Sequence, residues 1–191
     1  IHVEASPQPL GYRNKIVVHR DEGGRLGFFG TDHRSIVDIE KCLIANDPVY
    51  ERLASIRKES SKPWHVALSD PTQREDIPQG SFYQVNATMA QKLLEWVRKQ
   101  IVSANSEISS RFLDLYCGAG FFTLELADCF SQVCGVDRDV RAIHAATVLA
   151  QKRGIARASF FAAEIEERID WILETQASDQ FTLLVDPPRE G

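Results

Sequence analysis

The chain has 191 residues, 43% of them hydrophobic, which is enough for one ordinary domain or two small ones. No run of eighteen apolar residues occurs, so the sequence offers no candidate transmembrane helix. The formal net charge of −5 argues against a protein that coats nucleic acid with a uniformly basic surface, but it is compatible with an enzyme that has a local basic cleft.

Residues 1–80 carry the patterns of a small, mostly antiparallel α+β domain. Strand-like runs at 15–19 and 25–29 flank Gly23 and Gly24, which predicts a hairpin. We expect a third strand at 35–39, a helix at 46–58 with apolar residues on one face, and a further strand at 64–68.

Residues 81–191 alternate between helix and strand patterns. Asn86 or Thr88 can cap a first helix, in which apolar residues recur every four positions from Met89 to Ile101. The remaining expected elements are strands at 112–116, 132–137, 158–162 and 181–186, with helices at 122–129, 140–152 and 165–174. This alternation predicts an α/β, doubly wound parallel sheet, and such sheets bind ligands at the carboxyl ends of their strands.

The stretch LDLYCGAGFFTLELA places Gly118 and Gly120 between a predicted strand and a predicted helix. Glycines there let the backbone approach a ligand beneath a helix N-terminus. A dinucleotide-binding fingerprint would have a third glycine where Thr123 stands, so the loop disfavours NAD and FAD.

Asp137 ends the second predicted strand of this half, where a carboxylate can accept both ribose hydroxyls of an adenosine ligand. The alternative is a helix cap, since Asp137 and Asp139 both precede a helix, and capping is the preferred interpretation of Asp139. An adenosine ligand without a pyrophosphate fits S-adenosylmethionine. Asp114 would accept a hydrogen bond from the methionine amino group or, equally, from backbone amides of the loop.

Several stretches occur in an order that resembles the RNA uracil-5-methyltransferases. They are LDLYCGAGFFTLELA, CGVD, VDPPREG and GSFYQVNATMAQKL, preceded by PQPLGYRNKIVVH and RLGFFGTDHRSIVDIEKCLIA. The resemblance runs from Pro7 to Gly191. It implies a Rossmann-like, class I methyltransferase domain at 81–191, a smaller α+β segment at 1–80, and methylation of uridine C5 in transfer or ribosomal RNA.

The same resemblance implies roles for individual residues. Gln84 and Asp186 would contact both the cofactor and the target base, as the catalytic residues present in this chain. The other implied cofactor-binding residues are Tyr116, Gly118, Gly120, Phe121, Asp137 and Glu164. Phe121 stands where the family often has asparagine, and Glu164 where it often has Asn or Asp, near the adenine amino group. Pro187 and Pro188 would stiffen the Asp186 loop, because proline fixes φ.

Methylation at C5 requires a cysteine thiolate that adds to C6 and turns C5 into a nucleophile, followed by a base that removes the C5 proton. In the family, the cysteine and the glutamate base follow the proline loop, so we expect both beyond Gly191 and an inactive fragment here. Cys117 has a family counterpart that is not the nucleophile and is interpreted as a small packed residue. Cys42 stands where some relatives hold an iron–sulfur cluster, but residues 1–116 contain no other cysteine, so we expect no cluster and no metal site.

Two rival interpretations remain. The first is a methyltransferase acting on a base nitrogen, although Arg189 occupies the position where such enzymes have an aromatic residue. The second is a non-catalytic relative that binds RNA or a protein. We expect a cytoplasmic protein without an obligate protein partner. Phe28 and Phe29 could stack on a base, though core packing is the preferred interpretation, and His19 and His65 show no metal-ligand spacing.

Overall fold

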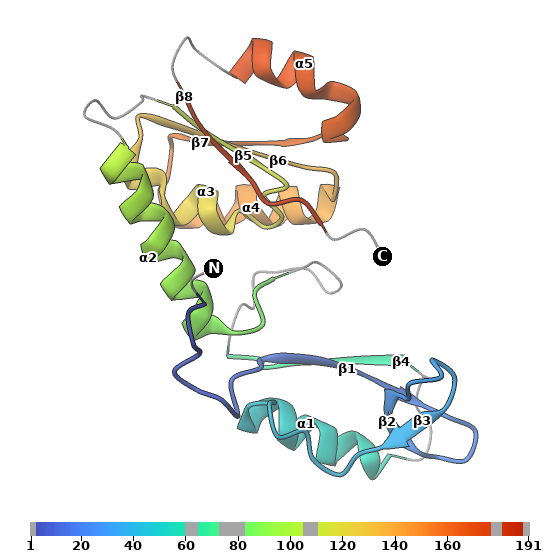
Figure 1. Cartoon of the computed structure of the whole chain (residues 1–191). Coiled ribbons are helices and arrows are strands. Elements are labelled where there is room, and N and C mark those ends of the chain that lie inside the picture. Colours follow the sequence, from blue (N-terminus) through green and yellow to red (C-terminus); the bar gives the residue numbers. More distant parts are fainter. Residues whose placement is uncertain (1–2, 60–64, 73–82, 105–110, 177–180, 189–191) are drawn as a thin grey trace. The chain divides into compact units, whose positions relative to one another are not determined.

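A computed structural model of the chain describes residues 3–59, 65–72, 83–104, 111–176 and 181–188. The chain forms two compact units (Figure 1). The first consists of Ile1–Glu75 with Gln84–Gln91, and the second of Asp76–Tyr83 with Lys92–Gly191. No helix among the described residues has the length and apolarity needed to cross a membrane.

The first unit is an antiparallel sheet with a helix on one face. Its strands are β1 (Lys15–Arg20), β2 (Leu26–Phe29), β3 (Ile36–Asp38) and β4 (His65–Ser69), in the order β3-β2-β1-β4. The predicted hairpin is confirmed, because His19 of β1 pairs with Gly27 of β2. Helix α1 (Asp47–Arg57) lies against one face of the sheet (Figure 1).

Local sequence signals explain where α1 begins and what holds it. The Asn46 side chain accepts a hydrogen bond from the Val49 N–H and caps the helix, as its residue type predicts. Val49 and Leu53 are fully buried against the sheet, next to Val18 and Leu26. These side chains form the core of the first unit.

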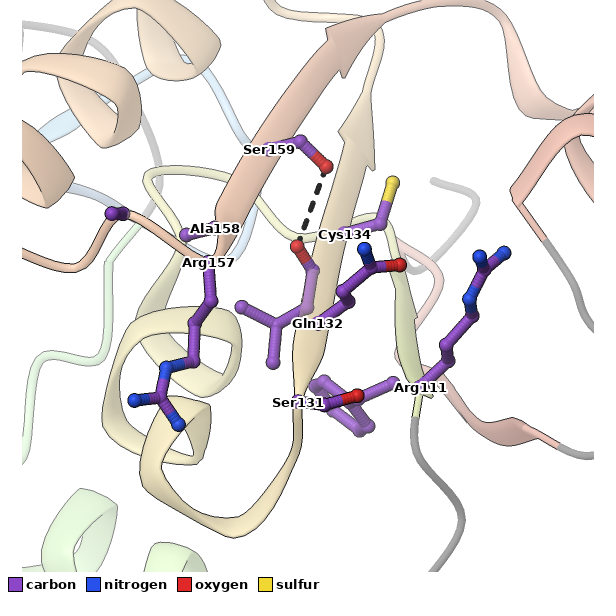
Figure 2. Close-up of a pocket in the computed structure, with 10 residues that line it drawn as sticks. Arg111, Ser131, Gln132, Cys134, Arg157, Ala158 and Ser159 are labelled. Atoms are coloured by element: carbon purple, nitrogen blue, oxygen red, sulfur yellow. Dashed lines mark hydrogen bonds between the residues drawn. The ribbon is translucent and has the colours of Figure 1, made fainter.

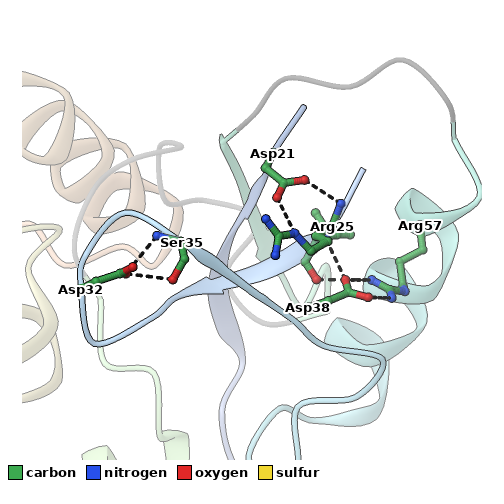
Figure 3. A network of polar contacts seen from close by, with 7 residues as sticks. Asp21, Arg25, Asp32, Ser35, Asp38 and Arg57 are labelled. Atoms are coloured by element: carbon green, nitrogen blue, oxygen red, sulfur yellow. Dashed lines mark hydrogen bonds and ion pairs between the residues drawn. The ribbon is translucent and has the colours of Figure 1, made fainter. Parts of the chain in front are cut away.

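A polar network ties the end of α1 to the edge of the sheet (Figure 3). The two guanidinium nitrogens of Arg57 each donate to one carboxylate oxygen of Asp38 at 2.8 Å, and the N–H of Leu26 also donates to Asp38. The bonds from Arg57 and then that from Leu26 lower the pKa of Asp38 to about 2. Asp38 is therefore ionised in the folded chain at neutral pH.

The second unit is built on a parallel sheet of β5 (Arg111–Leu115), β6 (Gln132–Asp137), β7 (Ala158–Ala162) and β8 (Phe181–Val185). Their order is β7-β6-β5-β8, and all pairs are parallel. Helices α3 (Phe121–Glu125) and α4 (Val140–Lys152) lie on one face, and α5 (Ile165–Gln176) lies on the other (Figure 1). The predicted doubly wound sheet is confirmed, and its order reverses between β5 and β8.

Helix α2 (Ala87–Ala104) joins the two units, since its first turns belong to one and its remainder to the other. Of the two predicted caps, Asn86 is the one used, and its side chain accepts from the Met89 N–H. The helix expected at 122–129 was wrong in extent: α3 has five residues, and a 3-10 turn, η1 (Ala127–Cys129), follows. Arg98 of α2 binds the carbonyl of Glu125, where α3 ends.

Candidate functional site

The carboxyl ends of β5 and β6 carry the segments that the sequence singles out as a cofactor site. The loop Tyr116–Gly120 follows β5, and Asp137 is the last residue of β6. Asp186 follows β8 on the other side of β5, and its N–H donates to the Leu115 carbonyl at 3.4 Å. These residues therefore meet at the point where the strand order reverses, the usual position of ligands in such sheets.

The glycine loop is a tight turn whose backbone conformation favours glycine and strains any other residue. Its backbone has positive φ at Tyr116 (64°), Gly118 (53°) and Gly120 (80°). A Cβ at Gly120 would also lie 3.0 Å from a ring atom of Phe160 on β7. Gly120 is therefore required both by its backbone conformation and by the close packing beneath the loop.

Asp137 holds the glycine loop to the end of β6. One carboxylate oxygen accepts the Gly118 N–H at 2.8 Å, and the other accepts the Asp139 N–H at 2.8 Å. Each carboxylate oxygen has a second lone pair, so these bonds leave acceptor capacity for the hydroxyl groups of a ribose. The residue that caps helix α4 is Asp139, whose side chain accepts hydrogen bonds from the N–H groups of Arg141 and Ala142.

Asp114 lies beneath the loop and is 1% exposed. One of its carboxylate oxygens accepts both the N–H (3.0 Å) and the hydroxyl (2.6 Å) of Thr123 in α3. Burial raises the pKa of Asp114 to about 7, and the hydrogen bonds from Thr123 offset only part of that shift. The sequence left two hydrogen-bond partners open for Asp114, the methionine amino group of the cofactor and backbone amides of the loop. In the structure Asp114 accepts from donors within the fold, the backbone N–H and the hydroxyl of Thr123.

Tyr116 reaches across the carboxyl edge of the sheet to α5. Its hydroxyl donates to a carboxylate oxygen of Glu166 at 2.7 Å, and this bond raises the pKa of Tyr116 while it lowers that of Glu166. Glu164 is exposed just before α5, where the Ala163 N–H donates to the Asp137 carbonyl at 3.0 Å. Sequence reasoning missed Glu166, because its pairing with Tyr116 spans fifty residues of chain.

The remaining predicted site residues differ in how far the structure locates them. Phe121 opens α3, half-buried, and packs partly against the core beside Phe122. Gln84 belongs to the first unit, so its place beside the cofactor site stays a prediction. Arg189 lies outside the described residues.

The four cysteines are free thiols, and three of them are buried. Cys117 lies in the glycine loop but is 7% exposed, and its sulfur is 2.8 Å from where a Cβ of Gly135 would lie. Burial, with Asp114 and Asp137 nearby, raises the pKa of Cys117 well above its ordinary value. Burial also raises the pKa of Cys134 to about 11. The interpretation of Cys117 as a packed residue therefore agrees with its surroundings.

A cavity of about 330 Å³ lies at the amino ends of β5, β6 and β7, on the opposite edge of the sheet (Figure 2). Arg111 and Arg157 flank β6 from opposite sides, and the Ser159 hydroxyl donates to the Val133 carbonyl at 3.4 Å. One guanidinium nitrogen of Arg157 donates to the Phe130 carbonyl. The guanidinium groups of the two arginines do not converge on one point of this cavity (Figure 2).

Among the residues that the structure describes, no cluster of three or more His, Cys, Asp or Glu side chains could hold a metal ion. Cys42 is buried at 8% exposure within the apolar core of the first unit. Its surroundings there are aliphatic side chains, including Ile16 and Val49.

The parallel sheet, the glycine loop and the acid at the end of the next strand are together typical of the doubly wound sheets that bind nucleotides at the carboxyl ends of their strands. Residues 65–191 match the family described as tRNA (Uracil-5-)-methyltransferase, and the chain belongs to that family. The resemblance drawn from the sequence motifs is thereby confirmed.

Individual relatives agree with this assignment. The chain is 26% identical over 226 aligned residues to the tRNA (uracil(54)-C(5))-methyltransferase of Schizosaccharomyces pombe, covering 97% of this chain and 42% of that protein. It is 36% identical over 113 residues to the 23S rRNA (uracil(1939)-C(5))-methyltransferase RlmD of Xanthomonas campestris, covering 58% and 24%. The chain thus spans less than half the length of both relatives.

A solved structure shares the fold over almost the whole chain. It is the tRNA (uracil-54, C5)-methyltransferase of Pyrococcus abyssi in complex with S-adenosyl-L-homocysteine, at a TM-score of 0.68 and 21% identity. The match covers 96% of this chain and 61% of that one. At this identity the likeness establishes the fold alone.

Proposed function

We propose that the chain is the cofactor-binding part of an S-adenosylmethionine-dependent methyltransferase that acts on C5 of uridine in a transfer or ribosomal RNA in the cytoplasm. The observation that carries the proposal is the placement of Asp137 against the Gly118 N–H at the carboxyl ends of β5 and β6. The family membership and the names of the relatives support the reaction and the substrate class.

In this proposal Asp137 accepts the ribose hydroxyls, and the backbone of Tyr116–Gly120 receives the methionine part of the cofactor. Glu164, at the end of β7, would accept from the adenine amino group. S-adenosylmethionine supplies an electrophilic methyl group once bound. Asp186 and Gln84 would contact the pyrimidine edge, with Asp186 presented beside the loop by the hydrogen bond of its N–H to Leu115.

We further propose that these 191 residues do not methylate uridine by themselves, because their thiols are unsuited to attack C6. The nucleophile must be a thiolate that reaches the base. Cys117 is buried under its own loop, and Cys134 lies within β6 with its pKa raised to about 11. Cys129 precedes β6, at the amino edge of the sheet, where it accepts a hydrogen bond from Arg98.

Two measurements on the chain test these statements separately. Calorimetric titration with S-adenosylmethionine and with S-adenosylhomocysteine should detect binding of both, and no binding of either would refute the cofactor site. Tritium release from RNA that contains 5-labelled uridine should stay at background. Release above that of a boiled sample would show that the chain supplies its own nucleophile.

A further inference from the structure

Thr123 of α3 stands where a dinucleotide-binding loop has its third glycine, and it is 0% exposed. In such loops that glycine lets the helix pack closely on the strand beneath it. Here the same position holds a hydroxyl, which donates to a carboxylate oxygen of Asp114 in β5 at 2.6 Å. A buried hydroxyl needs a hydrogen-bond partner, so the pairing with Asp114 explains how a polar side chain is accommodated between helix and strand.

The hydrogen bonds between Thr123 and Asp114 join the two ends of the glycine loop. The backbone N–H and the hydroxyl of Thr123 donate to the same carboxylate oxygen, at 3.0 and 2.6 Å. The residue that precedes α3 is Gly120, which has no side chain to accept a backbone N–H of the first turn. Asp114 therefore does for α3 what a capping side chain does for other helices. We call the pair Asp114 and Thr123 the loop clasp.

The backbone between the two residues of the loop clasp needs support from outside the loop. It has positive φ at Tyr116, Gly118 and Gly120, and Tyr116 is not a glycine. A residue with a side chain keeps this conformation only where its surroundings hold it there. The loop clasp holds the ends of the loop, and Asp137 holds its middle through the Gly118 N–H.

We propose that Thr123 is a positioning residue of the cofactor site, which acts through Asp114 to hold the glycine loop in the form that receives the ligand. The inference rests on the proposed function, which places S-adenosylmethionine against this loop. A loop that is ordered before binding does not have to be ordered by the ligand, so the affinity depends on the fraction of chains whose loop has the binding form. Thr123 is fully buried and acts without touching the ligand.

Thr123→Val tests the loop clasp, because valine has nearly the shape of threonine but no hydroxyl. Calorimetric titration with S-adenosylhomocysteine should show an affinity about tenfold lower, as expected if the loop keeps its binding form in about a tenth of the chains. Thr123→Ser keeps the hydroxyl and should restore most of the affinity. Thr147→Val is the matched control, because the Thr147 hydroxyl donates to the Ile143 carbonyl within α4 at 2.9 Å. This control should bind like the unmodified chain.

Amide hydrogen exchange, followed by NMR, observes the loop without any ligand. In the unmodified chain the Thr123 amide should exchange as slowly as the amides of β5, because both are hydrogen-bonded inside the fold. In Thr123→Val the amides of Gly118 and Gly120 should exchange faster, and S-adenosylhomocysteine should slow them again. The amides of α4 should be unchanged. Faster exchange throughout the second unit would show general destabilisation and would overturn the inference.

The outcomes separate the loop clasp from the proposed function. No binding of S-adenosylhomocysteine by the unmodified chain would refute the proposed function, and this inference with it. Binding by the unmodified chain and equally tight binding by Thr123→Val would overturn the loop clasp alone. Equal losses of affinity in Thr123→Val and Thr147→Val would also overturn it. Rapid exchange of the Thr123 amide in the unmodified chain would do so without requiring that any variant fold.

Discussion

The two units use carboxylates in opposite ways. In the antiparallel unit Asp38 lies at the sheet edge, 41% exposed, and two hydrogen bonds from Arg57 lower its pKa to about 2. In the parallel unit Asp114 lies under the glycine loop, and burial raises its pKa to about 7. Helices cover both faces of the parallel sheet, so a ligand can reach this sheet only at the ends of its strands. The polar side chains that shape the site therefore lie close to buried positions.

The largest expected effect comes from Asp114→Asn. An acid whose pKa is higher in the folded than in the unfolded chain binds its proton more tightly when folded. The contribution of Asp114 to stability should therefore be greatest at low pH and fall by up to about 1.4 kcal/mol per pH unit as the pH rises from about 4 to about 7. Thermal denaturation between pH 4 and pH 8 should show this slope in the unmodified chain and a shallower one in the variant. Identical slopes would contradict the raised pKa of Asp114.

A smaller effect is expected from Gly135→Ala in β6. The new Cβ would lie 2.8 Å from the Cys117 sulfur and 2.8 Å from two ring atoms of Phe160. We expect a loss of roughly 1–3 kcal/mol in the free energy of unfolding, measured with urea. Gly23→Ala in the β1–β2 turn is the control, because its nearest neighbour is an Asp21 oxygen at 3.4 Å, and it should change stability by less than about 0.5 kcal/mol. Equal effects would contradict the close packing beneath the loop.

The smallest effect is expected from Arg57→Ala. The pair with Asp38 is partly exposed, so its loss should cost about 1 kcal/mol at pH 7. Asp38 has a lowered pKa, so its contribution is present above about pH 4 and is lost as the pH falls toward 2, opposite in sign to that of Asp114. Urea unfolding at pH 7 and pH 3 should show a smaller difference from the unmodified chain at pH 3. A larger difference at pH 3 would refute the pairing.

The sequence predicted much of the fold because strands and helices in both units carry strong periodic patterns. The parallel sheet followed from the alternation of helix and strand, and the helix that begins after Asn46 followed from its apolar periodicity, whereas the strand order β7-β6-β5-β8 is known only from the structure. The short α3 was not predicted, because it ends where Arg98, some twenty-seven residues earlier, binds the Glu125 carbonyl.

The site, like the fold, was predictable where the sequence carries a local signal. The glycine loop and Asp137 carry local signals, and the structure brings them together at one hydrogen bond. Asp114 accepts a hydrogen bond from Thr123, and Tyr116 donates one to Glu166. These pairs result from tertiary packing, which no local sequence pattern indicates. The ring contacts of His19 with Phe29 and His65 depend on the register of the sheet, because the three residues lie on three different strands.

The central claim, that the carboxyl ends of β5 and β6 bind S-adenosylmethionine through Asp137, is tested most directly by isothermal titration of two neighbouring variants. Asp137→Asn keeps the shape of the side chain but removes the charge and one acceptor, and it should weaken binding of S-adenosylhomocysteine about tenfold or more. Asp139→Asn alters only the cap of α4 and should bind like the unmodified chain. Equal affinity of the Asp137→Asn variant and the unmodified chain would contradict the account.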